Sequence, residues 1–180
     1  ALAKQKPGKL NYGSSGVGTT THLGGAHFAS RTGIDLVHVP YKGSELLTDM
    51  VGGRLDAMFV PVAFLLQHIR DGKLHALGVT ANEPLHAPIE VPTVAAAADL
   101  PGYEYSTFYG FVAPAKTPPA ILDQLARDIR LTNNEPELRK WFTAQAIFQR
   151  DLGPAEFDQY IRTNMQRIGA LVKAVGATAN

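Results

Sequence analysis

The fold is decided by one stretch, Tyr12-Gly13-Ser14-Ser15-Gly16-Val17-Gly18-Thr19. It joins a predicted strand at 10–14 to a predicted helix at 19–32, and Gly33 stands where that helix ends. Glycine at such a joint permits positive φ and close approach of the backbone. The stretch therefore predicts a strand, a tight loop and a helix in immediate succession.

The same alternation continues outward along the chain. Further strands are predicted at 35–39, 55–60 and 74–80, with helices at 44–51 and 62–70 between them. Ser44 can cap the first of these helices, and Gly52 and Gly72 stand where the two helices end. A β-α-β-α-β-α-β order with short connections is typical of parallel strands with helices packed on the sheet. The sequence therefore predicts an α/β fold.

The pattern changes after residue 80. A proline-containing connection is predicted at 81–102 with a helical turn at 95–98, extended segments at 103–113 and 146–149, and helices at 118–131, 136–145 and 155–175. Residues 1–9 read as the end of a helix and lack the apolar core of a signal peptide. We therefore expect the sequence to be a fragment, with any export signal upstream.

Composition excludes several classes of protein. The chain has 180 residues, 45% hydrophobic and 18% charged, with a net charge of +1 and no cysteine. Lys and Arg are scattered, so no basic groove for nucleic acid is predicted. Without cysteine there is neither a disulfide nor a thiolate metal site, and the histidines lack metal-ligand spacing. We predict no metal and no cofactor.

The glycine loop carries the clearest chemical signal. Its glycines include Gly16 and Gly18, and the first-turn amides of the following helix have no intrahelical acceptor. The hydroxyl donors are those of Ser14, Ser15, Thr19 and Thr20. Because the helix dipole favours negative charge there, the loop predicts a carboxylate or phosphate site. The alternative is a turn that only caps the helix.

Three sharper motifs do not fit this loop. A dinucleotide-binding fingerprint needs a third glycine where Thr21 stands, and a P-loop needs lysine where Thr19 stands. A nucleophile elbow needs G-x-S-x-G, and Gly13-Ser14-Ser15-Gly16 closes one residue early. A neutral anion cradle is left.

Three further side chains are candidates for the same site. His22 lies in the first helical turn, where it can face the anion or be a half-buried histidine. Tyr41 and Lys42 directly follow the strand at 35–39. The carboxyl ends of parallel strands share one edge of a sheet, so Lys42 can add charge to the anion site or simply be a solvated loop lysine.

Several blocks together resemble the tripartite tricarboxylate transporter (TctC, or Bug) family of solute-binding proteins. Besides the segment from Tyr12 to Thr19 with His22, these blocks are His38-Val39-Pro40-Tyr41-Lys42-Gly43, Gly52-Gly53-Arg54-Leu55-Asp56-Ala57-Met58-Phe59, Gly72-Lys73-Leu74-His75-Ala76-Leu77, Val91-Pro92-Thr93 and Tyr109-Gly110-Phe111-Val112-Ala113-Pro114 with Thr117-Pro118. They follow the family's order almost from end to end.

The resemblance implies a two-lobed, hinged fold like that of type II periplasmic binding proteins. Residues 1–105 would be the second, ligand-binding lobe, a parallel-sheet lobe, and 106–180 the hinge strand and C-terminal part of the first lobe. Such a receptor captures a di- or tricarboxylate, an amino acid or an aromatic acid in the periplasm for the membrane components of a tripartite transporter. The glycine loop would hold the carboxylate, with Tyr41 and Lys42 on the rim, and no reaction would be catalysed.

The sequence departs from the family pattern in three places, one of which is Ser44-Glu45-Leu46, where the family commonly has small residues. Val60-Pro61 stands where the family often has Asp-Asn, and the part that opens the first lobe is absent, so we expect exposed sheet edges to favour self-association. Two other functions stay open at this point. One is an α/β hydrolase using Ser14 or Ser15 with His22, and the other is a ligand sensor that reports to a membrane partner.

Overall fold

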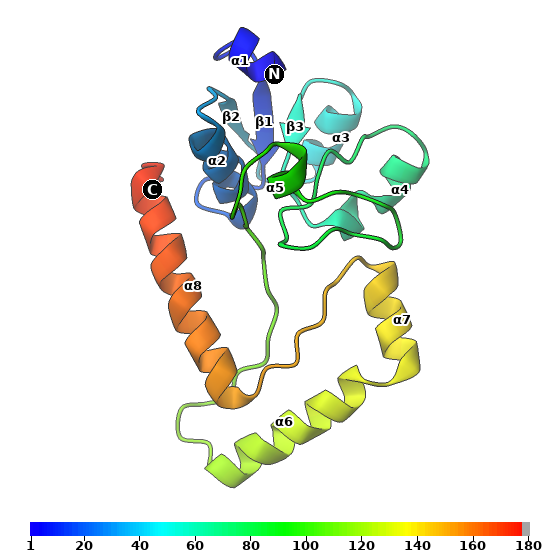
Figure 1. The fold of residues 1–180 in the computed structure, drawn as a ribbon, viewed down its shortest axis with the longest axis vertical. Coiled ribbons are helices and arrows are strands. Elements are labelled where there is room, and N and C mark those ends of the chain that lie inside the picture. The colour runs from blue at the N-terminus through cyan, green and yellow to red at the C-terminus, as the bar shows by residue number, and fades with distance from the viewer. Residues whose placement is uncertain (178–180) are drawn as a thin grey trace.

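A computed structural model describes residues 1–177, which form a small parallel sheet, its surrounding helices and a helical arm (Figure 1). The sheet consists of β1 (Asn11–Ser14), β2 (Val37–Pro40) and β3 (Ala57–Met58), in the order β2-β1-β3. Both neighbours run parallel to β1. The carboxyl end of β1, at Ser14, therefore lies in the middle of one sheet edge.

Helix α2 (Thr20–Thr32) follows β1 and packs directly against it. The helix begins after Thr19, whose hydroxyl accepts a hydrogen bond from the amide of His22, and it ends at Gly33 with φ 62°. Both predicted ends of this helix are confirmed. A Cβ at Gly25 would overlap the ring of Tyr12, so only glycine lets the helix approach the strand this closely. The approach leaves Tyr12 only 2% exposed.

The other helices are short around the sheet and longer in the arm. They are α1 (Leu2–Gln5), α3 (Glu45–Val51), the 3-10 turn η1 (Val62–Phe64), α4 (Leu66–Arg70), α5 (Val94–Ala97), α6 (Pro119–Asn133), α7 (Pro136–Ala144) and α8 (Pro154–Ala174). The predicted helices are confirmed to within about two residues, except that 62–70 divides into η1 and α4. Ser44 precedes α3, but its side chain makes no capping hydrogen bond.

Three predicted strands are absent from the sheet in the described part of the chain. In 74–80, the amide of Val79 donates to Pro92 at 2.8 Å and its carbonyl accepts from Val94 at 2.8 Å, so this segment pairs with the proline-containing connection. In 146–149, the amide of Ile147 turns back to Phe142 at 2.9 Å. The predicted β-α-β-α-β-α-β lobe is therefore wrong in its last strand, because the backbone groups of that segment are bonded elsewhere.

The third of these segments, 103–113, leaves the sheet region altogether. Its last hydrogen bond to that region runs from the amide of Tyr105 to Thr80 at 2.9 Å, and residues 106–113 make no backbone hydrogen bond within 1–177. Tyr109, Phe111 and Val112 there are 74–85% exposed. A segment whose backbone is extended and unpaired, and whose apolar side chains are exposed, resembles the open edge of a sheet.

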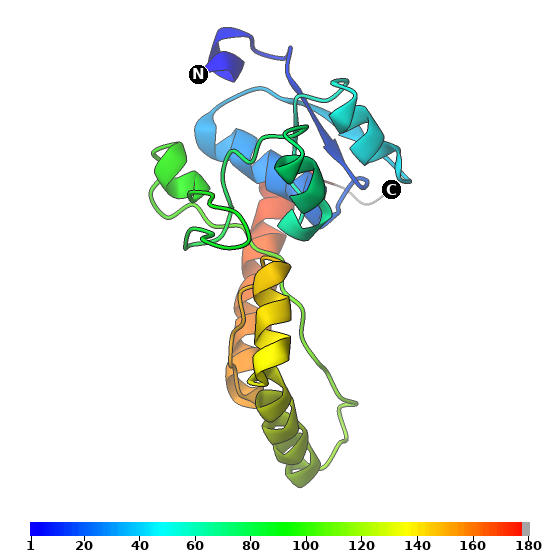
Figure 2. The same cartoon turned by 90° about the vertical axis from the view of Figure 1, so that its right-hand side faces the viewer.

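The arm formed by α6, α7 and α8 lies below the sheet in Figure 1, and α8 returns from it to run beside α2 (Figures 1 and 2). An ion pair between Arg167 of α8 and Glu104, at 3.7 Å, fixes this return. The predicted division into residues 1–105 and 106–180 stays a prediction, and its last three residues, 178–180, lie outside the described residues.

Gly25→Ala tests the packing of α2 on β1, and Gly169→Ala in α8 is its control. Both changes place alanine inside a helix, where it is favoured over glycine by about 1 kcal/mol. The Cβ at position 25 meets the ring of Tyr12, whereas position 169 faces open space. In urea unfolding we expect Gly25→Ala to destabilise the chain by about 1–3 kcal/mol through overpacking, and Gly169→Ala to be neutral or stabilising. Equal effects of the two changes would contradict this account.

The unpaired segment 106–113 predicts self-association of the chain. Sedimentation equilibrium should show a mass above 19.4 kDa that rises with concentration. The double change Phe111→Ser and Val112→Ser should bring the mass back to the monomer. Met165→Ser on α8, where the methionine is 70% exposed, should leave the association unchanged. A wild-type chain that stays monomeric at high concentration would refute the prediction.

Candidate functional site

The loop between β1 and α2 satisfies most of its own hydrogen-bonding groups. Four amides of the loop donate within it: Ser15 to Thr21 Oγ1 at 2.9 Å, Gly16 to Ser14 Oγ at 3.2 Å, Gly18 to His22 Nδ1 at 3.1 Å and Thr19 to the Gly16 carbonyl at 3.4 Å. Gly16 and Gly18 have φ of 123° and 79°, which the loop needs in order to close in this way. These groups shape the loop and are not free to hold a ligand.

Two backbone donors and one hydroxyl remain at the start of α2. The amides of Thr20 and Thr21 have no acceptor within residues 1–177, and neither has the hydroxyl of Thr20. They occupy the first turn of a 13-residue helix, where the dipole adds a partial positive charge. These donors of the first turn are therefore not used within the described residues.

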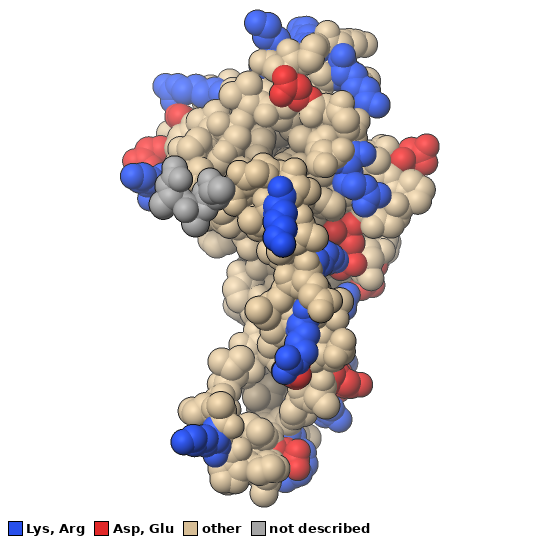
Figure 3. Space-filling view, turned by 90° about the vertical axis from the view of Figure 1, so that its left-hand side faces the viewer, with Lys and Arg blue, Asp and Glu red and all other residues tan. Residues whose placement is uncertain are grey.

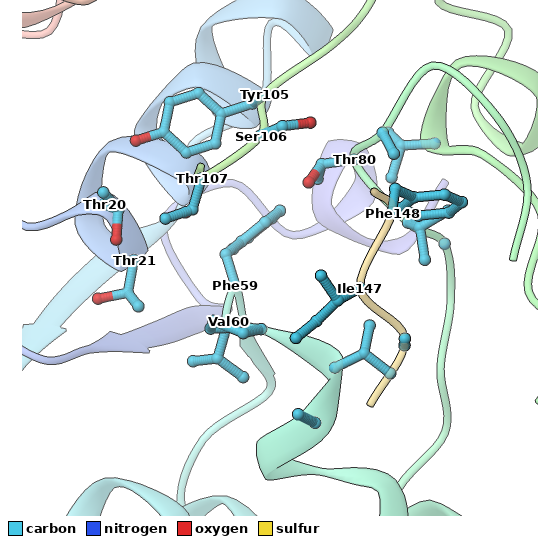
Figure 4. Close-up of a pocket in the computed structure, with 18 of the residues that line it drawn as sticks. Thr20, Thr21, Phe59, Val60, Thr80, Tyr105, Ser106, Thr107, Ile147 and Phe148 are labelled. Atoms are coloured by element: carbon cyan, nitrogen blue, oxygen red, sulfur yellow. The ribbon is translucent and has the colours of Figure 1, made fainter. Parts of the chain in front are cut away.

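The start of α2 opens into a hollow of about 2580 Å³ between the sheet region and the arm. Figure 4 shows Thr20 and Thr21 at one side of it, near the segment that carries Tyr105, Ser106 and Thr107. Phe59 and Val60 lie beside them in the same view, and Ile147 and Phe148 lie on the far side. Thr20 and Thr21 thus border open space that a small molecule can enter.

Ser14 lies beneath the loop and is paired with a histidine that the sequence analysis did not select. Its Oγ lies 2.6 Å from Nε2 of His38, and Ser14 is completely buried. The parallel register sets His38 opposite Tyr12, the residue two before Ser14. The only available signal was the place of His38 in the strand before Tyr41, and strand register cannot be obtained from one strand alone.

The two histidines form a neutral stack. The rings of His22 and His38 lie 4.0 Å apart, and the ring of Tyr12 lies 5.0 Å from that of His38. Burial, helped by the neighbouring His22, lowers the pKa of His38 to about 4. Burial also lowers the pKa of His22, whose Nδ1 accepts the Gly18 amide. His22 therefore braces the loop as a neutral ring near pH 7.

The backbone of Tyr41 contacts the loop, whereas its side chain points toward Asp49. The Tyr41 amide donates to the Ser14 carbonyl at 2.9 Å, while its hydroxyl donates to Asp49 at 2.9 Å. The hydrogen bonds from Tyr41 and Arg54 lower the pKa of Asp49. Lys42 is exposed, and neither Tyr41 nor Lys42 is among the residues that line the hollow. Their roles as ligand contacts stay predictions.

The geometry gives little support to the hydrolase alternative. Ser14 faces His38 and not His22, and Ser15 Oγ lies 2.9 Å from Thr21 Oγ1. A nucleophile must reach its substrate, and Ser14 has no exposed surface. Within residues 1–177, no group of three His, Asp or Glu residues gathers that could hold a metal.

Charge and hydropathy set further bounds. Basic and acidic side chains are mixed over the face in Figure 3 and form no single-sign stripe. None of the described helices has the length and apolar character needed to cross a bilayer.

Comparison with known proteins identifies the family. The family described as "Tripartite tricarboxylate transporter family receptor" (TctC) matches residues 1–177. The chain belongs to this family. The TctC chain is 40% identical over 137 residues to a UPF0065 protein in the tcbD–tcbE intergenic region of Pseudomonas sp., covering 76% of this chain and 41% of that protein. BugT of Bordetella pertussis is 30% identical, covering 98% of this chain and 54% of BugT.

Solved structures agree with this assignment and confirm the predicted α/β fold. An R. palustris protein solved with adipate superimposes with a TM-score of 0.83 at 26% identity, covering 97% of this chain and 58% of that one. A periplasmic transporter gives 0.83 at 32% identity, with 98% and 59% covered. The TctC chain thus spans about half to three-fifths of the length of most of these relatives. The family and fold are those of solute-binding proteins.

The histidine stack predicts how the stability of this TctC chain depends on pH. The pKa of His38 is about 4 in the folded chain against 6.5 in the unfolded one, so the unfolded chain binds more protons between these values. The free energy of unfolding should therefore fall as the pH drops from about 6.5 to 4. Because the ring is partly solvated, we expect His38 to account for about 1–2 kcal/mol of this loss.

The test is urea unfolding between pH 4 and 7 of the wild type and of His38→Gln, which cannot titrate there. This change should flatten the pH dependence, whereas His75→Gln, at an exposed position, should keep the wild-type slope. An unchanged slope in His38→Gln would show that the stack does not control the pH response.

Proposed function

We propose that this chain supplies the carboxylate-holding lobe of an extracytoplasmic receptor, which captures a small organic acid and delivers it to a tripartite transporter. The observation that carries the proposal is the pair of unpaired amides, Thr20 and Thr21, at the start of α2 beside the hollow. A carboxylate there accepts charge-assisted hydrogen bonds and complements the helix dipole. No base or exposed nucleophile is needed, so the acid is bound and released unchanged.

The candidate residues divide into two roles in this proposal. Thr20 and Thr21 hold the carboxylate, while the others hold the loop in shape: Ser14, Ser15, Gly16, Gly18, Thr19 and His22. Tyr41 and Lys42 form the outer rim of the same sheet edge. The binding of adipate by an R. palustris relative supports an organic acid as the ligand.

The proposal includes a cellular setting, which family membership supports. Residues 1–105 form one lobe, and 106–180 form the hinge strand and part of the other lobe. The acid is captured in the periplasm and handed to the membrane components of the transporter. Family membership and the solved periplasmic relatives support this placement.

Thr20→Pro tests the role of the amide, with Thr20→Val as the matched control. Proline suits the first helical position, and Thr19 has ψ 162°, the extended conformation that a residue before proline prefers. Thr20→Pro removes the amide hydrogen and the hydroxyl, whereas Thr20→Val removes the hydroxyl alone. A hydrogen bond to a charged group contributes about 1.5–3 kcal/mol, so Thr20→Pro should weaken acid binding at least about tenfold.

Binding is followed by the NMR shift of the Thr21 amide during titration with acetate, hexanoate, adipate and citrate. NMR detects even millimolar affinities, so the lobe can be studied by itself. At least one acid should move the Thr21 amide, and Thr20→Val should bind it more strongly than Thr20→Pro. If no acid moves this amide, or if Thr20→Pro binds like the wild type, the proposed site is wrong.

A further inference from the structure

Two kinds of side chain line the hollow beside Thr20 and Thr21. One kind is uncharged hydroxyls, those of Thr80, Ser106 and Thr107. Within residues 1–177 these hydroxyls have no described hydrogen-bond partner, so they are available to a ligand. The other kind, which we call the apolar wall, consists of the side chains of Phe59, Val60, Ile147 and Phe148, which lie among the hydroxyls in Figure 4. No side chain labelled in Figure 4 carries a charge at neutral pH.

The apolar wall is placed beside the anion position by the topology of the sheet. Phe59 and Val60 directly follow β3, which is the parallel neighbour of β1. The carboxyl ends of these two strands share one edge, and the loop that leads to Thr20 leaves from that edge. The ring of Phe59 is fixed edge-on against Tyr12, with 6.1 Å between the ring centroids. Because the ring of Phe59 packs against Tyr12, the position of the next residue, Val60, is restricted as well.

Four of the cations that line other parts of the hollow have a described partner, which is a carboxylate for two of them. Arg31 donates to the Pro101 carbonyl at 3.2 Å, Lys73 lies 3.5 Å from Asp71, Arg130 lies 3.0 Å from Asp151 and Arg150 lies over the ring of Tyr160 at 5.8 Å. Lys4 belongs to α1, which precedes the opposite end of β1. None of these contacts brings a cation to Phe59 or Val60.

These two kinds of side chain constrain the ligand beyond its one carboxylate. With that group on the amides of Thr20 and Thr21, the rest of the molecule lies against the hydroxyls and the apolar wall. A second carboxylate beside Phe59 and Val60 would find no hydrogen-bond donor among these side chains. Methylene or ring carbons in the same place would be removed from water, which is favourable.

We infer that the acid bound by this chain is a monocarboxylate with an apolar body, and that Val60 is a residue that determines this preference. The inference rests on the proposed carboxylate site at Thr20 and Thr21. The hydroxyls of Ser106 and Thr107 can form hydrogen bonds with one neutral polar group on the apolar body of the ligand, such as a hydroxyl or a carbonyl.

The test compares two acids of equal length, hexanoate and adipate, which differ in the second carboxylate. Affinities are measured from the Thr21 amide shift in the wild type, in Val60→Lys and in Val37→Lys. The control adds the same charge on β2, where the valine is 47% exposed and does not line the hollow. We expect the wild type to prefer hexanoate at least tenfold, which corresponds to about 1.4 kcal/mol.

Val60→Lys should abolish or invert this preference, because its ammonium group supplies the missing partner for the second carboxylate. Val37→Lys should keep the wild-type ratio. Val60→Thr, which keeps the shape of valine, is a second variant that covers loss of folding in Val60→Lys. It should weaken hexanoate binding several-fold and leave adipate binding unchanged.

The outcomes separate this inference from the proposed function. If adipate binds as well as hexanoate or better in the wild type, the apolar-body inference is wrong while the carboxylate site stands. If hexanoate is preferred but neither change at Val60 alters the ratio, Val60 does not determine the preference. If neither acid moves the Thr21 amide, the proposed function itself fails.

Discussion

The contact between the ring of Tyr12 and the backbone of α2 at Gly25 is the constraint on which the site depends. It brings the helix directly onto the central strand and buries the ring. Burial of this ring raises the pKa of Tyr12 to about 12, so the contact carries no charge at neutral pH. Because the helix axis is fixed by this contact, its first turn is fixed relative to the carboxyl end of β1. The amides of Thr20 and Thr21 are presented to the hollow as a consequence.

Most backbone amides of the loop above this contact form hydrogen bonds within the loop itself. Their acceptors lie on Thr21, Ser14, His22 and Gly16. Its histidine neighbours are neutral, so an anion at the proposed site would be attracted by amide dipoles and not by a full positive charge. A site of this kind would bind one carboxylate group and would discriminate little between the remaining parts of different ligands. Selectivity is then left to the walls of the hollow, where Val60 and the aromatic rings lie.

One segment outside the sheet region, 106–113, is extended but unpaired within the described residues. The segment has the composition of a strand. About two-fifths of the length of each of two solved relatives has no counterpart in this chain. The rings of Tyr109 and Phe111 in this segment are exposed, and such apolar surface favours contact with another polypeptide surface.

The sequence by itself determined the local elements and the family. Gly33 and the prolines at helix starts set the helix ends, because capping and φ restriction act within a few residues. The glycine loop pointed to an anion site for the same local reason. Only the tertiary structure decided that His38 pairs with Ser14, that Tyr41 turns to Asp49, and that residues 74–80 stay out of the sheet. These outcomes depend on strand register and on competition for hydrogen bonds between distant segments. A pattern of residue types records that a backbone is extended, but not which partner it finds.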